Sequence, residues 1–170
     1  LDALQKKLNW SKIRKIDSSH PYKGNLDLKK LEEALIKHQG KIAYVLVTAT
    51  CNSGGGQPVS IENMIEVSKI AKKHDCLVFL DGARYSENAY LIKDHEEKYA
   101  HMSTIEIVRE MMSCFDGCIM SAKKDALVNM GGFLALKDKT MADACTNLLI
   151  ITEGYTTYGG LSGRDMEAIA

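Results

Sequence analysis

The hydrophobic positions of the 170-residue chain alternate between two patterns. Short, nearly continuous apolar runs occupy residues 42–51, 76–81, 117–121 and 131–136, which is typical of strands buried on both faces of a sheet. Between and after these runs, apolar residues recur with the period of amphipathic helices, in residues 24–41, 60–71, 87–100, 103–115 and 139–153. Alternating strands and helices predict an α/β fold, with a mostly parallel sheet flanked by helices on both faces.

Capping residues mark where several of these helices begin and end. Asp27 and Ser60 stand where an N-cap is needed, and Gly40 is suited to a C-cap. Ser103 is followed three residues later by Glu106, which is the spacing of a capping box. These signals support the helical periods independently of the apolar pattern.

Polar residues follow each of the first three predicted strands. In chain order these residues are Asn52, then Asp81 with Arg84, and then Ser121 with Lys123 and Lys124. In a parallel sheet the carboxyl ends of the strands meet at one edge, where ligands bind. The sequence therefore predicts a binding site that combines a carboxylate, an amide, a hydroxyl and three cations.

The two adjacent lysines are the sharpest feature of this edge. Successive residues leaving a strand point to opposite sides, so one lysine can enter a pocket while the other faces solvent or phosphate. A partly desolvated lysine becomes a usable amine nucleophile. Two solvated lysines in a loop, and a structural Asp81–Arg84 ion pair, are the alternative interpretations. The glycine-rich loop at residues 52–58 fits either a close ligand or a sharp turn.

Taken together, a lysine, an aspartate and an arginine or asparagine match the needs of pyridoxal phosphate. This cofactor requires an amine for its aldehyde, a carboxylate for its ring nitrogen and a donor for its phenolate oxygen.

Composition limits the other classes of function. Lys plus Arg and Asp plus Glu number 22 each, so no basic stripe favours nucleic acid. No apolar run reaches the roughly 18 residues that a membrane span needs. The five cysteines lack the paired spacing of a zinc site and are expected to be reduced thiols of a cytoplasmic protein.

Four segments resemble the β-eliminating lyases, the family of tryptophanase and tyrosine phenol-lyase. They are "NSGGGQPVS" (52–60), "DGARYSENAYLIK" (81–93), "SAKKDALVNMGGFLALKD" (121–138) and "EGYTTYGGLSGRDMEAIA" (153–170). The resemblance runs in order from about Gly24 to the end of the chain. It implies the large domain of the aspartate-aminotransferase (type I) fold, pyridoxal 5'-phosphate, a potassium ion and a homotetramer.

The resemblance also implies a role for each polar residue at the strand exits. Lys124 is similar to the lysine that binds the cofactor aldehyde and moves the substrate's α-proton, and Asp81 to the partner of the ring nitrogen. Arg84 and Asn52 are similar to the groups that bond the phenolate oxygen. The remaining roles are phosphate contact at Ser121, charge adjustment at Lys123 and a backbone carbonyl for potassium at Asn129.

The resemblance also predicts what the chain lacks. Residues 1–170 are expected to be an internal part of the cofactor-binding large domain, because the chain has no initiator methionine and stops inside a helical pattern. The family's phosphate loop, ring-stacking aromatic and substrate-carboxylate arginine have no counterpart here. In addition, residues 52–57 have a glycine where the family commonly has alanine. The chain alone is expected to be inactive.

By resemblance, the full-length protein converts L-tryptophan to indole, pyruvate and ammonia. "NS" at 52–53 and "SAKKDA" at 121–126 are closer to tryptophanase. "NMGGF" at 129–133 and "GRDMEA" at 163–168 are closer to tyrosine phenol-lyase, which releases phenol from L-tyrosine and is the alternative. A lyase for another amino acid and a non-catalytic truncated protein of this fold, which would bind only partners, remain open.

Overall fold

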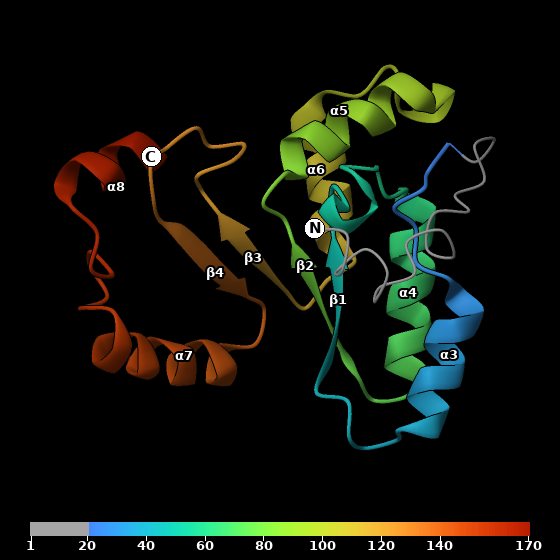
Figure 1. The fold of residues 1–170 in the computed structure, drawn as a ribbon, viewed down its shortest axis with the longest axis horizontal. Helices are drawn as coiled ribbons and strands as arrows, with labels where there is room; N and C mark the ends of the chain where they lie inside the picture. The colour runs from blue at the N-terminus through green and yellow to red at the C-terminus, as the bar shows by residue number, and fades with distance from the viewer. Residues whose placement is uncertain (1–20) are drawn as a thin grey trace, which may run out of the picture.

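The computed structural model describes residues 21–170, which form one mixed sheet with helices around it (Figure 1). The strands are β1 (Tyr44–Thr48), β2 (Leu77–Asp81), β3 (Gly117–Ser121) and β4 (Gly132–Leu136). The helices are α3 (Leu28–Lys37), α4 (Ile61–Lys73), α5 (Tyr85–His95), α6 (Thr104–Ser113), α7 (Lys139–Thr152) and α8 (Gly163–Ile169). Two short 3-10 helices, η1 (Asn52–Gly54) and η2 (Glu97–Tyr99), lie in the connections.

The order of the strands in the sheet is the order in the chain, β1-β2-β3-β4. The first three strands are parallel, and β4 pairs antiparallel with β3 (Figure 1). The predicted α/β fold with a mostly parallel sheet is confirmed. The direction of β4 follows from its connection, because residues 122–131 contain no helix and a parallel crossover needs a dozen or more residues.

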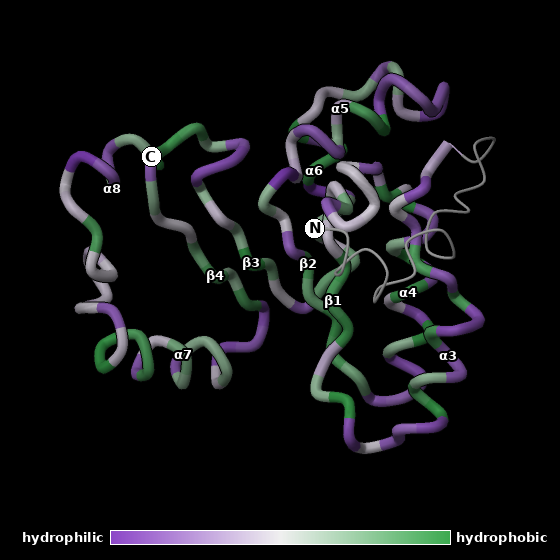
Figure 2. The backbone as a smooth tube through the Cα atoms, viewed as in Figure 1, coloured by the Kyte–Doolittle hydropathy of each residue, from purple (hydrophilic) through white to green (hydrophobic). Residues whose placement is uncertain are grey.

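One face of the sheet is covered by α4, α5 and α6. Val47, Val78 and Leu80 point to this face and are completely buried. They pack in a single apolar cluster with residues of the three helices, including Met64, Val67, Ala71, Ala89, Ile92, Ile107 and Met111. Figure 2 shows the corresponding stretches of β1 and β2 as hydrophobic tube. At about 25 cal/mol per Å² of apolar surface removed from water, this cluster supplies the main stabilisation of the described residues.

The opposite face of the sheet is only partly covered. Tyr44 and Leu46 of β1, Ile119 of β3 and Leu134 of β4 point to this face and are between 41% and 48% exposed. On this side α7 and α8 lie beyond β4, away from the other helices (Figure 1). The prediction of helices on both faces therefore holds, but the second layer is incomplete over residues 21–170.

The capping signals place three helix starts correctly. The side chains of Asp27, Ser60 and Ser103 accept hydrogen bonds from amides of the first turns of α3, α4 and α6. Ser103 and Glu106 form both hydrogen bonds of a capping box. At the other end of α3, the helix ends at Lys37, and Gly40 adopts φ 71° in the turn that follows.

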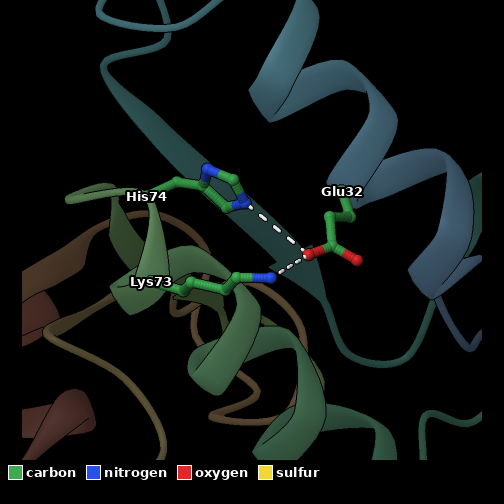
Figure 3. A network of polar contacts seen from close by, with 3 residues as sticks. All are labelled: Glu32, Lys73 and His74. Carbon is green, nitrogen blue, oxygen red and sulfur yellow. Dashed lines mark hydrogen bonds and ion pairs between the residues drawn. The ribbon is translucent and has the colours of Figure 1, made fainter.

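A polar network fastens α3 to α4 at the rim of the core (Figure 3). The Glu32 carboxylate lies 2.6 Å from the Lys73 ammonium and 3.8 Å from Nε2 of His74. The hydrogen bond from Lys73 is the main cause that lowers the pKa of Glu32. Such partly exposed pairs contribute little to stability.

No helix among residues 21–170 is long and apolar enough to cross a lipid bilayer.

Candidate active site

The three parallel strands bring their exits together at one edge, as predicted. Asp81 pairs in register with Thr48 of β1 and with Ile119 of β3. Beyond the strands, the Ala49 amide donates to the Asp81 carbonyl (3.0 Å) and the Gly82 amide to the Ile119 carbonyl (2.9 Å). The three connecting loops therefore leave the sheet as direct neighbours, at the roughly 4.8 Å spacing of paired strands.

Asp81 is the last residue of β2 and is half-buried. Its Oδ1 accepts a hydrogen bond from the Ala83 amide at 3.3 Å. The alternative of a structural Asp81–Arg84 ion pair is wrong for the described residues, in which Asp81 forms no ion pair. Burial raises the pKa of the nearby Cys118 thiol, and the negative charge of Asp81 raises it further, which keeps this buried cysteine in the neutral form.

Arg84 stands at the N-cap of α5, directly after the β2 exit. Its amide donates to the Ala49 carbonyl at 3.3 Å, so the arginine is anchored to the end of the neighbouring β1 segment. Asn52, the first residue of η1, follows the same β1 segment and is exposed. Arg84 and Asn52 therefore belong to the two loops that leave β2 and β1 as neighbours at this edge.

The glycine-rich loop has a conformation that explains its glycines. Gly55 and Gly56 adopt φ 85° and 77°, in the left-handed region that glycine enters without steric cost. They turn the chain back so that the Cys51 amide can donate to the Gln57 carbonyl at 2.8 Å. The turn alone accounts for these two glycines, so they are no evidence for a ligand.

The lysine pair lies in the loop that connects β3 and β4. Lys123 is exposed, whereas Lys124 is half-buried. The Lys124 carbonyl accepts a hydrogen bond from the Leu127 amide at 2.9 Å, which closes a turn in which Leu127 has φ 58°. The two lysines thus differ in exposure, although both lie in a turn and not on an extended strand.

Sequence reasoning missed one residue of this loop, Asp125. Its Oδ2 accepts hydrogen bonds from the amides of Ser86 (2.8 Å) and Glu87 (3.1 Å), in the first turn of α5. No local sequence signal indicates this role, because the start of α5 after Arg84, whose side chain cannot accept a capping hydrogen bond, is known only from the structure.

Ser121 and Asn129 complete the set of predicted residues. Ser121 ends β3 opposite Gly132 and lies on the same face of the sheet as Asp81, two residues after its register partner. Asn129 is exposed in the β3–β4 loop, and its backbone carbonyl receives no hydrogen bond from the described part of the chain. No group of three or more His, Cys, Asp or Glu side chains in residues 21–170 could hold a metal ion.

The donor set at this edge fits pyridoxal phosphate. Within residues 21–170, no carboxylate forms an ion pair with Arg84, Lys123 or Lys124, although Asp81 stands at the same edge. The side chains of Ser121 and Asn52 likewise form no hydrogen bond within these residues. An amine, two further cations, a hydroxyl and an amide, together with a carboxylate whose only hydrogen bond comes from the Ala83 amide, are therefore available within residues 21–170 to a zwitterionic ligand with a phosphate group.

A hollow of the described residues lies elsewhere. Its volume is about 720 Å³, and it opens between β3, β4, α7 and α8, with lining residues that include Ile119, Leu134, Leu149 and Met166. None of the predicted site residues lines it. This hollow is therefore separate from the candidate site at the edge of the sheet.

Comparisons with known proteins identify the family. The sequence profile of the β-eliminating lyases matches residues 4–161. The chain is 51% identical to a tryptophanase of Salinibacter ruber over 154 residues, 91% of this chain and 33% of that protein. It is 52% identical to a tyrosine phenol-lyase of Symbiobacterium thermophilum over 155 residues, 90% of this chain and 34% of that protein.

Among solved structures, one neighbour is a putative aromatic amino acid β-eliminating lyase/threonine aldolase from Exiguobacterium. Its TM-score is 0.47 at 23% identity, over 64% of this chain and 27% of that one. The chain spans about one third of the length of the curated relatives that it matches. On the family profile and these identities, the chain belongs to the β-eliminating lyase family.

Proposed function

We propose that the full-length protein is a pyridoxal-phosphate-dependent carbon–carbon lyase that converts L-tryptophan to indole, pyruvate and ammonia. The observation that supports the proposal is that Lys124, Asp81 and Arg84 lie at or after the exits of neighbouring strands on one edge of the sheet, and that none of the three forms an ion pair within residues 21–170. Membership of the β-eliminating lyase family supports the same chemistry.

Each side chain of the edge has one task in this proposal. When bound, the cofactor supplies an electron sink for the substrate's α-carbon. Lys124 holds the cofactor aldehyde and takes the α-proton of the substrate. Asp81 keeps a proton on the ring nitrogen, because a half-buried carboxylate stabilises a cation that it faces. Arg84 and Asn52 donate to the phenolate oxygen.

The phosphate end of the cofactor is assigned to the third strand exit. Ser121 donates its hydroxyl to a phosphate oxygen, and Lys123 contributes positive charge beside it, which is the arrangement that phosphate binding requires. In this assignment the half-buried Lys124 faces the cofactor and the exposed Lys123 faces its phosphate or solvent. The potassium ion at the Asn129 carbonyl, the homotetramer and the cytoplasmic location stay predictions from the family resemblance.

Tyrosine is the second candidate substrate. A tyrosine phenol-lyase of Symbiobacterium thermophilum is as similar to this chain as a tryptophanase of Salinibacter ruber, at 52% and 51% identity. Tryptophan is preferred on the motifs at residues 52–53 and 121–126, which include the loop of the proposed cofactor lysine. A non-catalytic role is disfavoured because the chain keeps every polar residue of the candidate site.

The test uses the full-length protein with added pyridoxal phosphate. We expect borohydride reduction followed by peptide mass spectrometry to find the cofactor on Lys124, and we expect indole to be released from tryptophan faster than phenol from tyrosine. Lys124→Ala should abolish both the covalent attachment and the release of indole.

Lys123→Ala is the matched control, because it removes the neighbouring ammonium and leaves the attachment point. It should keep the covalent cofactor and bind it more weakly. Attachment that persists in Lys124→Ala would move the attachment point, most directly to Lys123. If phenol is released faster than indole, tyrosine replaces tryptophan as the proposed substrate. If the wild type carries no covalently attached cofactor, the proposed cofactor chemistry is rejected.

A further inference from the structure

The first turn of α5 has a capping need that its own sequence does not meet. The first amides of a helix have no intrahelical partner and are normally satisfied by a Ser, Thr, Asp or Asn at the N-cap. In α5 the N-cap residue is Arg84, and no side chain of this residue caps the helix. By contrast, α3, α4, α6 and α7 each begin with a local capping side chain.

Asp125 meets this need from 38 and 39 residues further along the chain. Its Oδ2 accepts from the amides of Ser86 and Glu87, the second and third residues of α5, at 2.8 and 3.1 Å. Its own amide donates to the Ala83 carbonyl at 3.4 Å. A carboxylate at this position also faces the positive end of the helix dipole.

These three contacts join two parts of the proposed site. On one side, Ala83 and Ser86 bracket Arg84, which follows Asp81 by three residues. On the other side, Asp125 is bonded covalently to Lys124. Although Asp125 is adjacent to a lysine, it forms no ion pair with Lys123 or Lys124 within residues 21–170. Its carboxylate is therefore committed to α5 rather than to the ammonium groups.

We propose that Asp125 is a positioning residue that fixes the lysine loop against the Asp81–Arg84 loop, and so sets where the Lys124 amine stands relative to Arg84 and Asp81. The kinetic consequence rests on the proposed function, because it requires that Lys124 moves a substrate proton. The position of the Lys124 amine does not rest on the proposed function, because it can be measured without cofactor or substrate.

The geometric part is tested on the cofactor-free, full-length protein. Competitive acetylation with mass spectrometry compares the rates at which Lys124 and Lys123 are modified, and hydrogen exchange follows the amides of Ser86 and Glu87. We expect Lys124 to react several-fold more slowly than Lys123 in the wild type. In Asp125→Ala this ratio should approach one, and the two amides should exchange faster.

Asp125→Asn and Asp27→Ala serve as matched variants. Asparagine keeps an acceptor oxygen and should restore most of the wild-type ratio, which a loss of folding would not allow. Asp27→Ala removes the cap of α3, which accepts from Lys30 at 3.1 Å, and should leave the lysine ratio unchanged. Faster exchange in Asp125→Ala with an unchanged lysine ratio would reduce Asp125 to a helix cap and overturn the proposal.

The kinetic part is measured on the same variants loaded with pyridoxal phosphate. A displacement of about 1 Å of a catalytic group can lower a rate by up to about 100-fold. We expect kcat of Asp125→Ala to fall by about 10-fold to 100-fold, with KM changed much less and with partial recovery in Asp125→Asn. A wild type that carries no cofactor on Lys124 would reject the proposed function, while the acetylation ratio would still decide the positioning role. If Asp125→Ala carries the cofactor on Lys124 and has the kcat of the wild type, the positioning role of Asp125 is overturned.

Discussion

Two halves of the molecule contain similar proportions of apolar sequence but bury very different amounts of it. In the half formed by β1, β2, α4, α5 and α6, three of the five residues of β2 are buried and α4 contributes six buried residues. In the half formed by β4, α7 and α8, neither β4 nor α7 has a buried residue. The apolar face of α7 therefore has too little partner surface among residues 21–170.

The difference shows that an apolar period predicts a helix but not its burial. Burial needs a second surface, and here α7 contacts mainly β4 across the 720 Å³ hollow. Regions with few buried apolar contacts open at low free energy, whereas core elements open only with global unfolding. We therefore expect the two halves to respond differently to matched substitutions.

The largest contrast is expected from truncating one isoleucine in each half. Ile107 of α6 is 0% exposed and Ile151 of α7 is 82% exposed. Ile107→Ala should lower the free energy of unfolding by about 2–5 kcal/mol, because it leaves a cavity in a packed core. Ile151→Ala should change it by less than about 0.5 kcal/mol. Urea denaturation of the chain, followed by circular dichroism, measures the free energy of unfolding of both variants. Similar decreases in the two variants would contradict the difference between the halves.

A smaller contrast is expected from adding a methyl group to Gly117 of β3, the strand that pairs with β2, and to Gly163 of the half formed by β4, α7 and α8. A Cβ on Gly117 of β3 would lie 2.6 Å from a ring carbon of Phe79 and 2.7 Å from the Ala135 carbonyl oxygen. Gly117→Ala should therefore cost about 1–3 kcal/mol. Gly163, the first residue of α8, has no atom within 4 Å of such a Cβ, so Gly163→Ala should be neutral or slightly stabilising. Thermal unfolding measures both, and a destabilised Gly163→Ala would reveal a contact that this geometry lacks.

The smallest contrast is expected from removing one helix cap in each half. Ser103→Ala should cost about 1 kcal/mol, because α6 is part of the core. Asp138 accepts a hydrogen bond from the Met141 amide at 2.7 Å and so caps the first turn of α7, a helix without buried residues. Asp138→Ala should therefore fray α7 with little effect on the free energy of global unfolding. Hydrogen exchange resolved by peptide separates the two, and global destabilisation by Asp138→Ala would contradict the comparison.

The Ser103 cap also has a defined pH dependence. Hydrogen bonds from the side chain and the amide of Ser103 lower the pKa of Glu106 below its ordinary value of 4.5. A lowered folded-state pKa contributes stability that is complete above the unfolded pKa and is lost as the pH falls through the folded pKa. The difference between wild type and Ser103→Ala should therefore shrink as the pH falls below 4.5. A difference that is constant with pH would remove Glu106 from the cap.

Local signals explain why most of the fold could be predicted from the sequence. The four predicted strands match β1 to β4 within a few residues, and capping by Asp27, Ser60 and Ser103 is confirmed, because each depends on neighbouring residues. The start of α5 was predicted near residue 87 but lies at Tyr85, because its cap comes from Asp125, far along the chain. Non-local capping leaves no periodic signal.

In the candidate site, too, some features could be predicted from the sequence and others could not. The common edge of Asp81, Arg84 and the lysine loop could be predicted, because parallel strands must exit together. Which lysine is the less exposed could be suggested only by resemblance, since alternation predicts opposite directions without saying which residue faces inward. The hydrogen bonds from the first turn of α5 to Asp125 and the hollow near β4 depend on tertiary packing, and no short motif encodes them.

The agreement between strand order and chain order bears on how the protein is made. Among the described strands β1 emerges first during synthesis, and each later one can pair with the strand completed just before it. Each of β2, β3 and β4 pairs with a strand that has already been synthesised. The sheet can therefore grow outward during translation, and each strand's exposed edge is soon occupied by the next, which shortens the time in which a nascent chain could pair with a wrong neighbour.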